Sequence, residues 1–238
     1  MTQSVKPEVP PRAGNEHPVE FSMIMASAVH DMKNSLGMLL HSLDELRREL
    51  PDQTAESRMN TLRYEAERVH GDLVQLLGLY RLDQDSLSAR LEEHYLPDFI
   101  EAQMARHKPL LDGHCITPDI AVGPLSGYFD ADLLAGVIND TVNNAIRYTR
   151  KRIRISAFQR ENMLVIQVAD DGAGYPDAML DTTRQIPTSI DFQQGHTRLG
   201  LFFAREIARL HRNGDRYGYI QLSNGGPLGG GVFEILLP

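Results

Sequence analysis

Residues 133–149 read LLAGVINDTVNNAIRYT, and the interpretation of the whole chain depends on their polar pattern. Asp140, Asn144 and Arg147 follow one another at intervals of four and three residues, within an apolar periodicity that predicts an amphipathic helix over 131–148. Such residues share one helical face. A carboxylate, an amide oxygen and a guanidinium there suit Mg²⁺ and phosphate, because hard cations take oxygen ligands. The alternative is an ordinary polar surface.

Two glycine-containing segments follow this helix. VADDGAGYP, residues 168–176, is a strand that ends in Asp-Asp-Gly-Ala-Gly, where glycine permits close approach of the backbone to a ligand. GHTRLGLFFAREIARLH, residues 195–211, runs from a glycine-containing loop into a helix, whose unpaired N–H groups favour phosphate. Taken singly, the first is equally well a tight turn and the second a connection without a ligand.

Upstream, VHDMKNSL (residues 29–36) places His30 on the flank of a long helix, beside its apolar stripe. Asn34 lies about one turn after His30, and Asp31 is adjacent and could hold one ring nitrogen while the other stays free to attack. A surface histidine on a helix is more often only solvated, so this segment proves nothing alone.

The fold class predicted from these patterns is α+β. Apolar residues spaced by threes and fours on both sides of PDQTAES predict a long helical hairpin, which a second copy would complete to a four-helix bundle in a homodimer. Alternating short strands and helices then predict a two-layer α/β sandwich. The expected divisions are a flexible tail at 1–19, the hairpin at 20–85 and the α/β domain at 91–238. The expected strands are 91–96, 114–121, 126–129, 152–159, 162–169, 217–223 and 231–237, the expected helices are 97–108, 131–148 and 198–212, and 170–198 is a long loop.

Composition narrows the function. A net charge of −8 provides no basic footprint for nucleic acid. Apolar runs are too short to span a bilayer, and the first residues lack the apolar segment of a signal peptide, so no membrane insertion and a cytoplasmic location are expected. Cys115 lies in an apolar-rich stretch and is expected to be a buried structural thiol. The sequence has neither a GxxxxGK[ST] phosphate loop nor a GxGxxG motif on a strand–helix turn, so two common nucleotide-binding folds are excluded.

In sequence order, these four motifs resemble the boxes of two-component sensor histidine kinases, whose ATP-binding domain belongs to the superfamily shared with gyrase, Hsp90 and MutL. VHDMKNSL resembles the phosphoacceptor box, NDTVNNAIRYT the asparagine box, DDGAGYP the first glycine box and GHTRLGL the second. The resemblance covers residues 20–238. It implies that His30 is phosphorylated, that Asp31 is its hydrogen-bonding and base partner, and that Asn34 positions water for dephosphorylating a partner protein.

For the ATP-binding domain, the resemblance implies Mg²⁺ and ATP as cofactors. It makes Asn144 the principal Mg²⁺ ligand, Arg147 a phosphate contact, Tyr148 a wall of the pocket and Asp170 the acceptor for the adenine amino group. It also makes residues 175–194 a mobile ATP lid. The remaining residues that it places in the nucleotide site are Gly172, Gly174, Gly195, Thr197, Arg198, Gly200 and Leu201.

Three positions depart from the family pattern. Asp140 stands where these kinases more often have asparagine and gyrase-like relatives have a catalytic glutamate, so a base role and a metal-coordinating role are both open. Ser35 replaces a common proline, which removes a helix bend but no reactive group. Arg198 replaces a glycine, and its cation would either clamp phosphate or obstruct the approach of the backbone.

The function expected from this resemblance is autophosphorylation of His30 from Mg-ATP and transfer of the phosphoryl group to an aspartate of a response regulator, with a phosphatase role alongside. The stimulus would come through an upstream sensory partner, the tail or the bundle. One alternative is a histidine phosphotransferase or phosphatase adaptor with a vestigial ATP domain, which Arg198 favours. Another is an ATPase or anti-sigma-type kinase of the same superfamily, which leaves the His30 hairpin unexplained.

Overall fold

The computed structural model describes residues 88–180 and 197–238, together with part of the chain between Val29 and Tyr80. The described positions in that earlier part are helical. One of them, Gly78, faces α6, where an added Cβ would come 2.7 Å from the ring of Phe203. The turn of the predicted hairpin, its pairing into a bundle and the tail at 1–19 lie outside the described residues.

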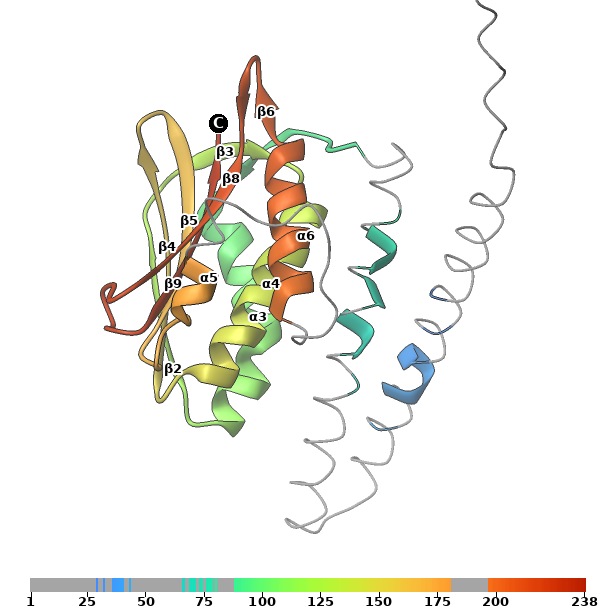
Figure 1. Cartoon of the computed structure of the whole chain (residues 1–238), viewed down its shortest axis with the longest axis vertical. Helices are drawn as coiled ribbons and strands as arrows, with labels where there is room; N and C mark the ends of the chain where they lie inside the picture. The colour runs from blue at the N-terminus through green and yellow to red at the C-terminus, as the bar shows by residue number, and fades with distance from the viewer. Residues whose placement is uncertain are drawn as a thin grey trace, which may run out of the picture.

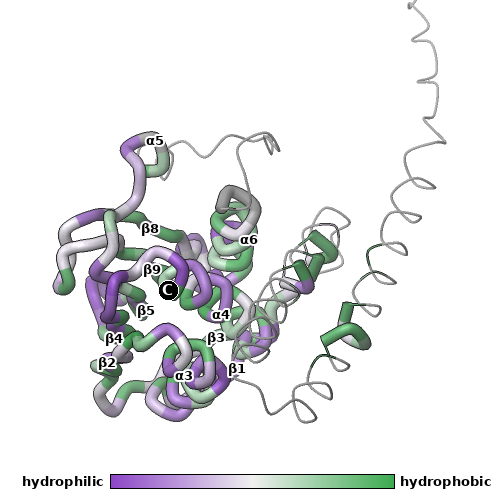
Figure 2. The backbone as a smooth tube through the Cα atoms, turned by 90° about the horizontal axis from the view of Figure 1, so that it is seen from below, coloured by the Kyte–Doolittle hydropathy of each residue, from purple (hydrophilic) through white to green (hydrophobic). Residues whose placement is uncertain are grey.

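The domain from residue 92 onward has two layers, which separate clearly in Figures 1 and 2. A mixed five-stranded sheet of order β2-β4-β5-β9-β8 forms one layer, and three long helices cover one of its faces. Only β2 and β4 are parallel neighbours. The elements in chain order are β1 (Glu92–Tyr95), α3 (Leu96–Gly113), β2 (Thr117–Val122), β3 (Ser126–Phe129), α4 (Ala131–Tyr148), β4 (Arg152–Arg160), β5 (Met163–Asp170), α5 (Asp177–Leu180), α6 (Thr197–Leu210), β6 (Arg212–Asn213), β7 (Arg216–Tyr217), β8 (Tyr219–Asn224) and β9 (Gly231–Leu237). The predicted two-layer α/β sandwich is confirmed for this part of the chain.

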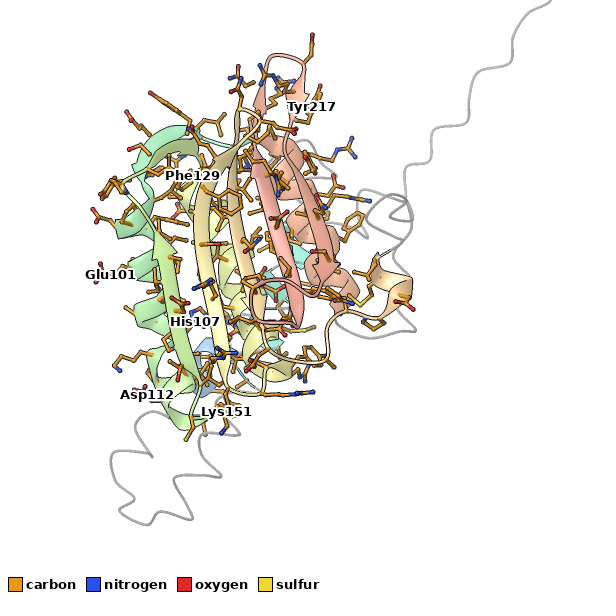
Figure 3. The ribbon with its side chains drawn as sticks, turned by 90° about the vertical axis from the view of Figure 1, so that its left-hand side faces the viewer. Glu101, His107, Asp112, Phe129, Lys151 and Tyr217 are labelled. Carbon is orange, nitrogen blue, oxygen red and sulfur yellow. The ribbon has the colours of Figure 1, made fainter. Side chains whose placement is uncertain are left out.

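The core lies between the sheet and the helices. Side chains of the central strands alternate between the two faces, so Ile155, Ile166 and Ile235 point toward the helices and are almost completely buried. Ile138 of α4 and Ile207 of α6 meet them from the other layer and are equally buried. Each such side chain stabilises the fold by roughly 1.5–3 kcal/mol, which makes this interface the main source of stability. Among the described residues, no helix covers the opposite face of the sheet, which is toward the viewer in Figure 3.

Helix α4 begins and ends as its sequence predicts. Asp130 is the N-cap, and its side chain accepts hydrogen bonds from the backbone N–H groups of Asp132 and Leu133 at 3.1 and 3.0 Å. The other oxygen of Asp130 accepts from the N–H of Arg90 at 2.9 Å. The segment that leads into the domain is thereby tied to the start of the helix that carries Asp140 and Asn144.

The end of α3 differs from the prediction. The helix continues past Pro109 to Gly113, and β2 begins at Thr117 instead of residue 114. The N–H groups of Cys115 and Ile116 return to the carbonyls of Asp112 and Leu111, a Schellman motif in which Cys115 has a φ of 55°. Cys115 is therefore exposed at the helix end, and the expectation of a buried thiol is wrong.

Two small elements were not predicted. The β6–β7 hairpin follows α6 and projects from one end of the domain, where Figure 3 labels Tyr217. The short helix α5 interrupts the segment 170–198 that was predicted to be a loop.

Candidate nucleotide-binding site

A cavity of about 390 Å³ opens between α4, α6 and the loop that follows β5. Its volume falls within the range usual for small-molecule sites. Four segments that are distant in sequence contribute its walls. The lining residues are Asp140, Thr141, Asn144, Ala145, Tyr148, Asp170, Gly174, Tyr175, Pro176, Met179, Gly200, Leu201, Ala204, Gly231 and Phe233.

Helix α4 supplies the polar wall. Asp140, Asn144 and Tyr148 lie four residues apart on the face that lines the cavity, and the Asn144 Nδ2 donates to Asp140 Oδ2 at 3.4 Å. Arg147 does not line the cavity. It is exposed, with its guanidinium 6.0 Å from the centre of the Tyr148 ring. The helix therefore presents a carboxylate and an amide to a ligand, and leaves the predicted phosphate contact on its outer flank.

The chemistry of this wall fits a magnesium ion. When Nδ2 of Asn144 donates to Asp140, the amide oxygen of Asn144 is left to face a cation, and the Asp140 carboxylate lies beside it. Among the described residues there is no group of three or more His, Cys, Asp or Glu side chains that could hold a metal. Mg²⁺ typically takes one or two protein oxygens and fills its remaining positions with phosphate and water.

Asp170 lies at the end of β5 on the opposite wall and is 8% exposed. Its Oδ1 accepts from the N–H groups of Gly172 at 2.7 Å and Gly231 at 3.2 Å. The described part of the chain donates no hydrogen bond to Oδ2. This arrangement holds the carboxylate rigidly and leaves one oxygen for a donor on a ligand, such as an exocyclic amino group.

Two of the predicted glycines allow close packing around these carboxylates. A Cβ on Gly172 would lie closer than 3.0 Å to the carbonyl oxygen of Tyr148, and one on Gly200 would lie equally close to Asp140 Oδ2. Gly200 belongs to α6, whose early residues Gly200 and Leu201 line the cavity. Absence of a side chain at Gly200 therefore lets α6 approach the polar face of α4.

Tyr175 is a lining residue that the sequence patterns did not single out. Its ring lies against Gly231, where an added Cβ would come 3.1 Å from Tyr175 Cε2. Burial raises the pKa of the Tyr175 phenol well above its ordinary value, and the charges of Asp170 and Asp140 raise it further. The phenol therefore stays protonated and can donate a hydrogen bond into the cavity.

Asp171 has a structural role, although it neighbours Asp170. Its Oδ1 accepts from the hydroxyl of Thr149 at 2.5 Å and from three consecutive backbone N–H groups, those of residues 150–152, at 2.8–3.2 Å. Burial by itself would raise its pKa, but these hydrogen bonds outweigh burial and hold the pKa of Asp171 well below its usual range. The carboxylate thus fixes the turn between α4 and β4, at the end of the sheet where Figure 3 labels Lys151.

Several predicted site residues lie outside the described part of the chain. They are His30, Asp31 and Asn34 of the phosphoacceptor segment and Gly195 of the second glycine segment. The backbone of Thr197 and Arg198 belongs to the first turn of α6, but their side chains are not among those described. The structure therefore brings together Asp140, Asn144, Tyr148, Asp170, Gly172, Gly174, Gly200 and Leu201.

Comparison with known proteins identifies the domain. Residues 129–238 match the family model described as histidine kinase-, DNA gyrase B- and HSP90-like ATPase. The sensor protein kinase WalK of Staphylococcus haemolyticus (strain JCSC1435) is 24% identical over 197 residues, which cover 79% of this chain and 32% of that protein. The alignment with WalK of Staphylococcus aureus has the same identity and covers 48% of that protein. The chain is a relative of two-component sensor histidine kinases.

Solved structures of such kinases share the fold of this chain. The Acinetobacter baumannii histidine kinase AdeS superposes with a TM-score of 0.58 at 20% identity, over 86% of this chain and 95% of that one. Full-length ShkA in complex with AMPPNP gives a TM-score of 0.62 at 19% identity, over 91% of this chain and 46% of that one. The predicted family resemblance is confirmed. The chain spans about a third to a half of the length of the two WalK proteins. Within its described residues, no helix is long and apolar enough to cross a membrane.

Proposed function

We propose that the chain is a sensor histidine kinase that binds Mg-ATP in the cavity, phosphorylates His30 and passes the phosphoryl group to an aspartate of a response regulator. The observation that carries this proposal is the pairing of Asp140 and Asn144 on one wall with the hydrogen-bonded carboxylate of Asp170 on the other. One wall suits a metal–phosphate group and the other a base with an amino group. A ligand that carries both groups is a nucleoside triphosphate.

The proposed domain organisation assigns one task to each part. Residues 20–85 form the dimerisation and phosphoacceptor hairpin, which docks the receiver domain of the response regulator, and residues 91–238 bind ATP. The tail at 1–19 and an upstream sensory partner are the proposed routes for a stimulus. A dimer formed through the hairpin would bury the apolar residues that a single hairpin leaves exposed.

In the proposed reaction, Asp170 would orient the base, and the oxygens of Asn144 and Asp140 would hold Mg²⁺, which would neutralise phosphate charge. A ring nitrogen of His30 attacks the γ-phosphorus in line, the bond from that phosphorus to the bridging oxygen breaks, and ADP leaves with the electron pair. Asp31 steadies the ring and accepts its proton. The protein supplies position and charge, as phosphoryl transfer requires. In the separate phosphatase role, Asn34 would position water for dephosphorylating the response regulator.

The test is incubation of the full chain with γ-labelled ATP and Mg²⁺, alongside His30→Gln and the matched control His114→Gln, an exposed histidine at the end of α3. We expect label that survives alkali and is lost in acid on the wild type and on His114→Gln. We expect none on His30→Gln. Full labelling of His30→Gln would refute the assignment of the acceptor.

Nucleotide binding distinguishes this function from the adaptor with a vestigial ATP domain. A functional site should stabilise the protein by about 2.7 kcal/mol when Mg-ATP is present at 100 times Kd, measured as a shift of thermal unfolding. A protein that shows neither the shift nor label would be the phosphotransferase or phosphatase adaptor.

A further inference from the structure

Asn224, the last residue of β8, pairs through its side chain with the backbone of a single residue in the loop after β5. Its Oδ1 accepts from the N–H of Tyr175 at 2.7 Å, and its Nδ2 donates to the carbonyl of Tyr175 at 2.8 Å. The amide thus satisfies the backbone N–H and C=O of one residue as a neighbouring strand would. The two residues are 49 positions apart in the sequence, so the pairing exists only in the folded domain. We call this pair of hydrogen bonds the Asn224 clasp.

The loop after β5 is anchored at its start by the hydrogen bonds of Asp171 and near its end by the clasp. Tyr175 precedes Pro176, which has no N–H, so the loop can donate no hydrogen bond through the nitrogen of that next residue. Gly174 has a φ of 84°, and a Cβ there would come 2.6 Å from Asn224 Oδ1. Glycine at 174 therefore permits both the backbone conformation and the approach of the amide. Among the described residues, only Asn224 hydrogen-bonds to the backbone N–H and carbonyl of Tyr175.

The same connection between β8 and β9 also holds the other end of this loop. The N–H of Gly230 donates to the carbonyl of Asp170 at 3.0 Å, and the N–H of Gly231 donates to its carboxylate at 3.2 Å. In both contacts the connection contributes only backbone N–H groups. Asn224 is the point at which the connection acts on the loop through a side chain.

Asn224 does not itself line the cavity, but Tyr175 does. The Tyr175 ring lies against Gly231, next to the oxygen of Asp170 that faces a ligand. We propose that Asn224 is a positioning residue for the nucleotide site: by clasping Tyr175 it fixes the wall beside Asp170 against which the base packs. It sets the affinity for adenine nucleotides and takes no part in phosphoryl transfer. This inference rests on the proposed ATP site.

Asn224→Leu, which removes both hydrogen bonds, and Asn224→Asp, which keeps the acceptor but sets an oxygen against the Tyr175 carbonyl, test the clasp in the full chain. Asn213→Asp, an exposed change in the β6–β7 hairpin, is the matched control for added charge. Kd for ATP and ADP is measured by calorimetry, kcat at saturating ATP by labelling, and exchange of the Tyr175 amide by NMR without nucleotide.

We expect Asn224→Leu and Asn224→Asp to raise Kd roughly tenfold, which corresponds to about 1.4 kcal/mol. The affinities for ATP and for ADP should fall by the same factor in Asn224→Leu, because the two nucleotides share the base. The kcat should stay within about twofold, since binding lost equally from substrate and transition state leaves kcat unchanged. Hydrogen exchange of the Tyr175 amide should be faster in Asn224→Leu. Asn213→Asp should have the Kd, the kcat and the exchange rate of the wild type.

Nucleotide affinity within about twofold of the wild type in Asn224→Leu, despite faster exchange of the Tyr175 amide, would overturn the positioning role. A parallel fall in kcat and in the melting temperature of the nucleotide-free protein would also overturn it, because that pattern indicates a merely structural residue. Wild-type protein that binds no ATP would refute the proposed function itself and with it the role of Asn224. In that case the exchange rates would still show whether the clasp forms.

Discussion

Gly200 of α6 lies directly against the carboxylate of Asp140, and this contact leaves no room for a methyl group. We predict that Gly200→Ala lowers the affinity for Mg-ATP by about tenfold or more. The added Cβ must displace Asp140 or the helix, and overpacking of this kind costs typically 1–3 kcal/mol. Titration of the full chain with Mg-ATP in a calorimeter measures the change.

Gly136→Ala is the matched control for Gly200→Ala. Gly136 lies on α4, and a Cβ there would meet the ring of Phe203 at 3.7 Å, an ordinary contact. It should leave ATP affinity unchanged and stabilise the helix by up to about 1 kcal/mol. Equal effects of the two substitutions would show that the close approach of Gly200 to Asp140 has no bearing on the ligand.

At the scale of elements, the end of α3 holds a non-glycine residue in a conformation that favours glycine. Cys115 has a φ of 55° in the Schellman motif, and the flanking residues Leu111 and Ile116 are buried. We predict that Cys115→Gly raises the free energy of unfolding by roughly 0.5–1 kcal/mol, because glycine adopts this φ without the steric cost of a Cβ. Urea unfolding at constant pH measures the gain.

Cys115→Ala provides the control for that prediction, because it removes the thiol but keeps the Cβ. It should leave stability near that of the wild type. If alanine and glycine stabilised the protein to the same extent, removal of the thiol would be the cause and the backbone explanation would fail.

Elements with strong local signals were predicted well from the sequence. Helix α4 was predicted at 131–148, its observed bounds, because its apolar periodicity is a local signal. The apolar run of β5 likewise predicted a strand that the structure places in the middle of the sheet. The end of α3 was misplaced because burial of Leu111 outweighs the local signal of Pro109 to end the helix.

Part of the candidate site could likewise be predicted from local patterns in the sequence. Helical spacing alone placed Asp140, Asn144 and Arg147 on one face, and the family resemblance added Tyr148. Asn224, Gly230 and Gly231 were missed because their contacts with the loop after β5 span 49–61 residues, and no local pattern encodes such a pairing. Arg147 was grouped with the site by spacing, but it lies on the exposed flank of α4.

At the scale of the whole domain, His211 connects parts that are distant in sequence. It is 1% exposed, its Nδ1–H donates to the carbonyl of Ile207 at 2.8 Å, and its Nε2 accepts from the N–H of Asp130 at 3.0 Å. A proton on Nε2 would face that N–H, so the folded state requires the neutral ring. Burial lowers the pKa of His211 below 6.5, although the bond to Ile207 and the charge of Asp130 oppose the shift.

We therefore predict that acid weakens the domain through His211. Its contribution is fully present above pH 6.5, the unfolded value, and is lost as the pH falls toward the lower folded pKa, because only the unfolded chain then binds the proton. The slope is at most about 1.4 kcal/mol per pH unit. In urea unfolding between about pH 7.5 and pH 5, His211→Gln, whose amide can both donate and accept, should flatten this slope. The exposed His114→Gln should not, and equal slopes in all three proteins would refute the role of His211.

The walls of the cavity come from α4, the end of β5, α6 and β9, so Asp140 and Gly231 line one cavity although they lie far apart in the sequence. Strand β9 lies between β5 and β8, and its first N–H completes the shell around Asp170. A partly folded chain in which β9 is not yet inserted has no such cavity. During refolding from urea, a fluorescent ligand of this site would therefore bind only to molecules whose sheet is complete. Circular dichroism would also detect the helices of molecules whose sheet is still incomplete.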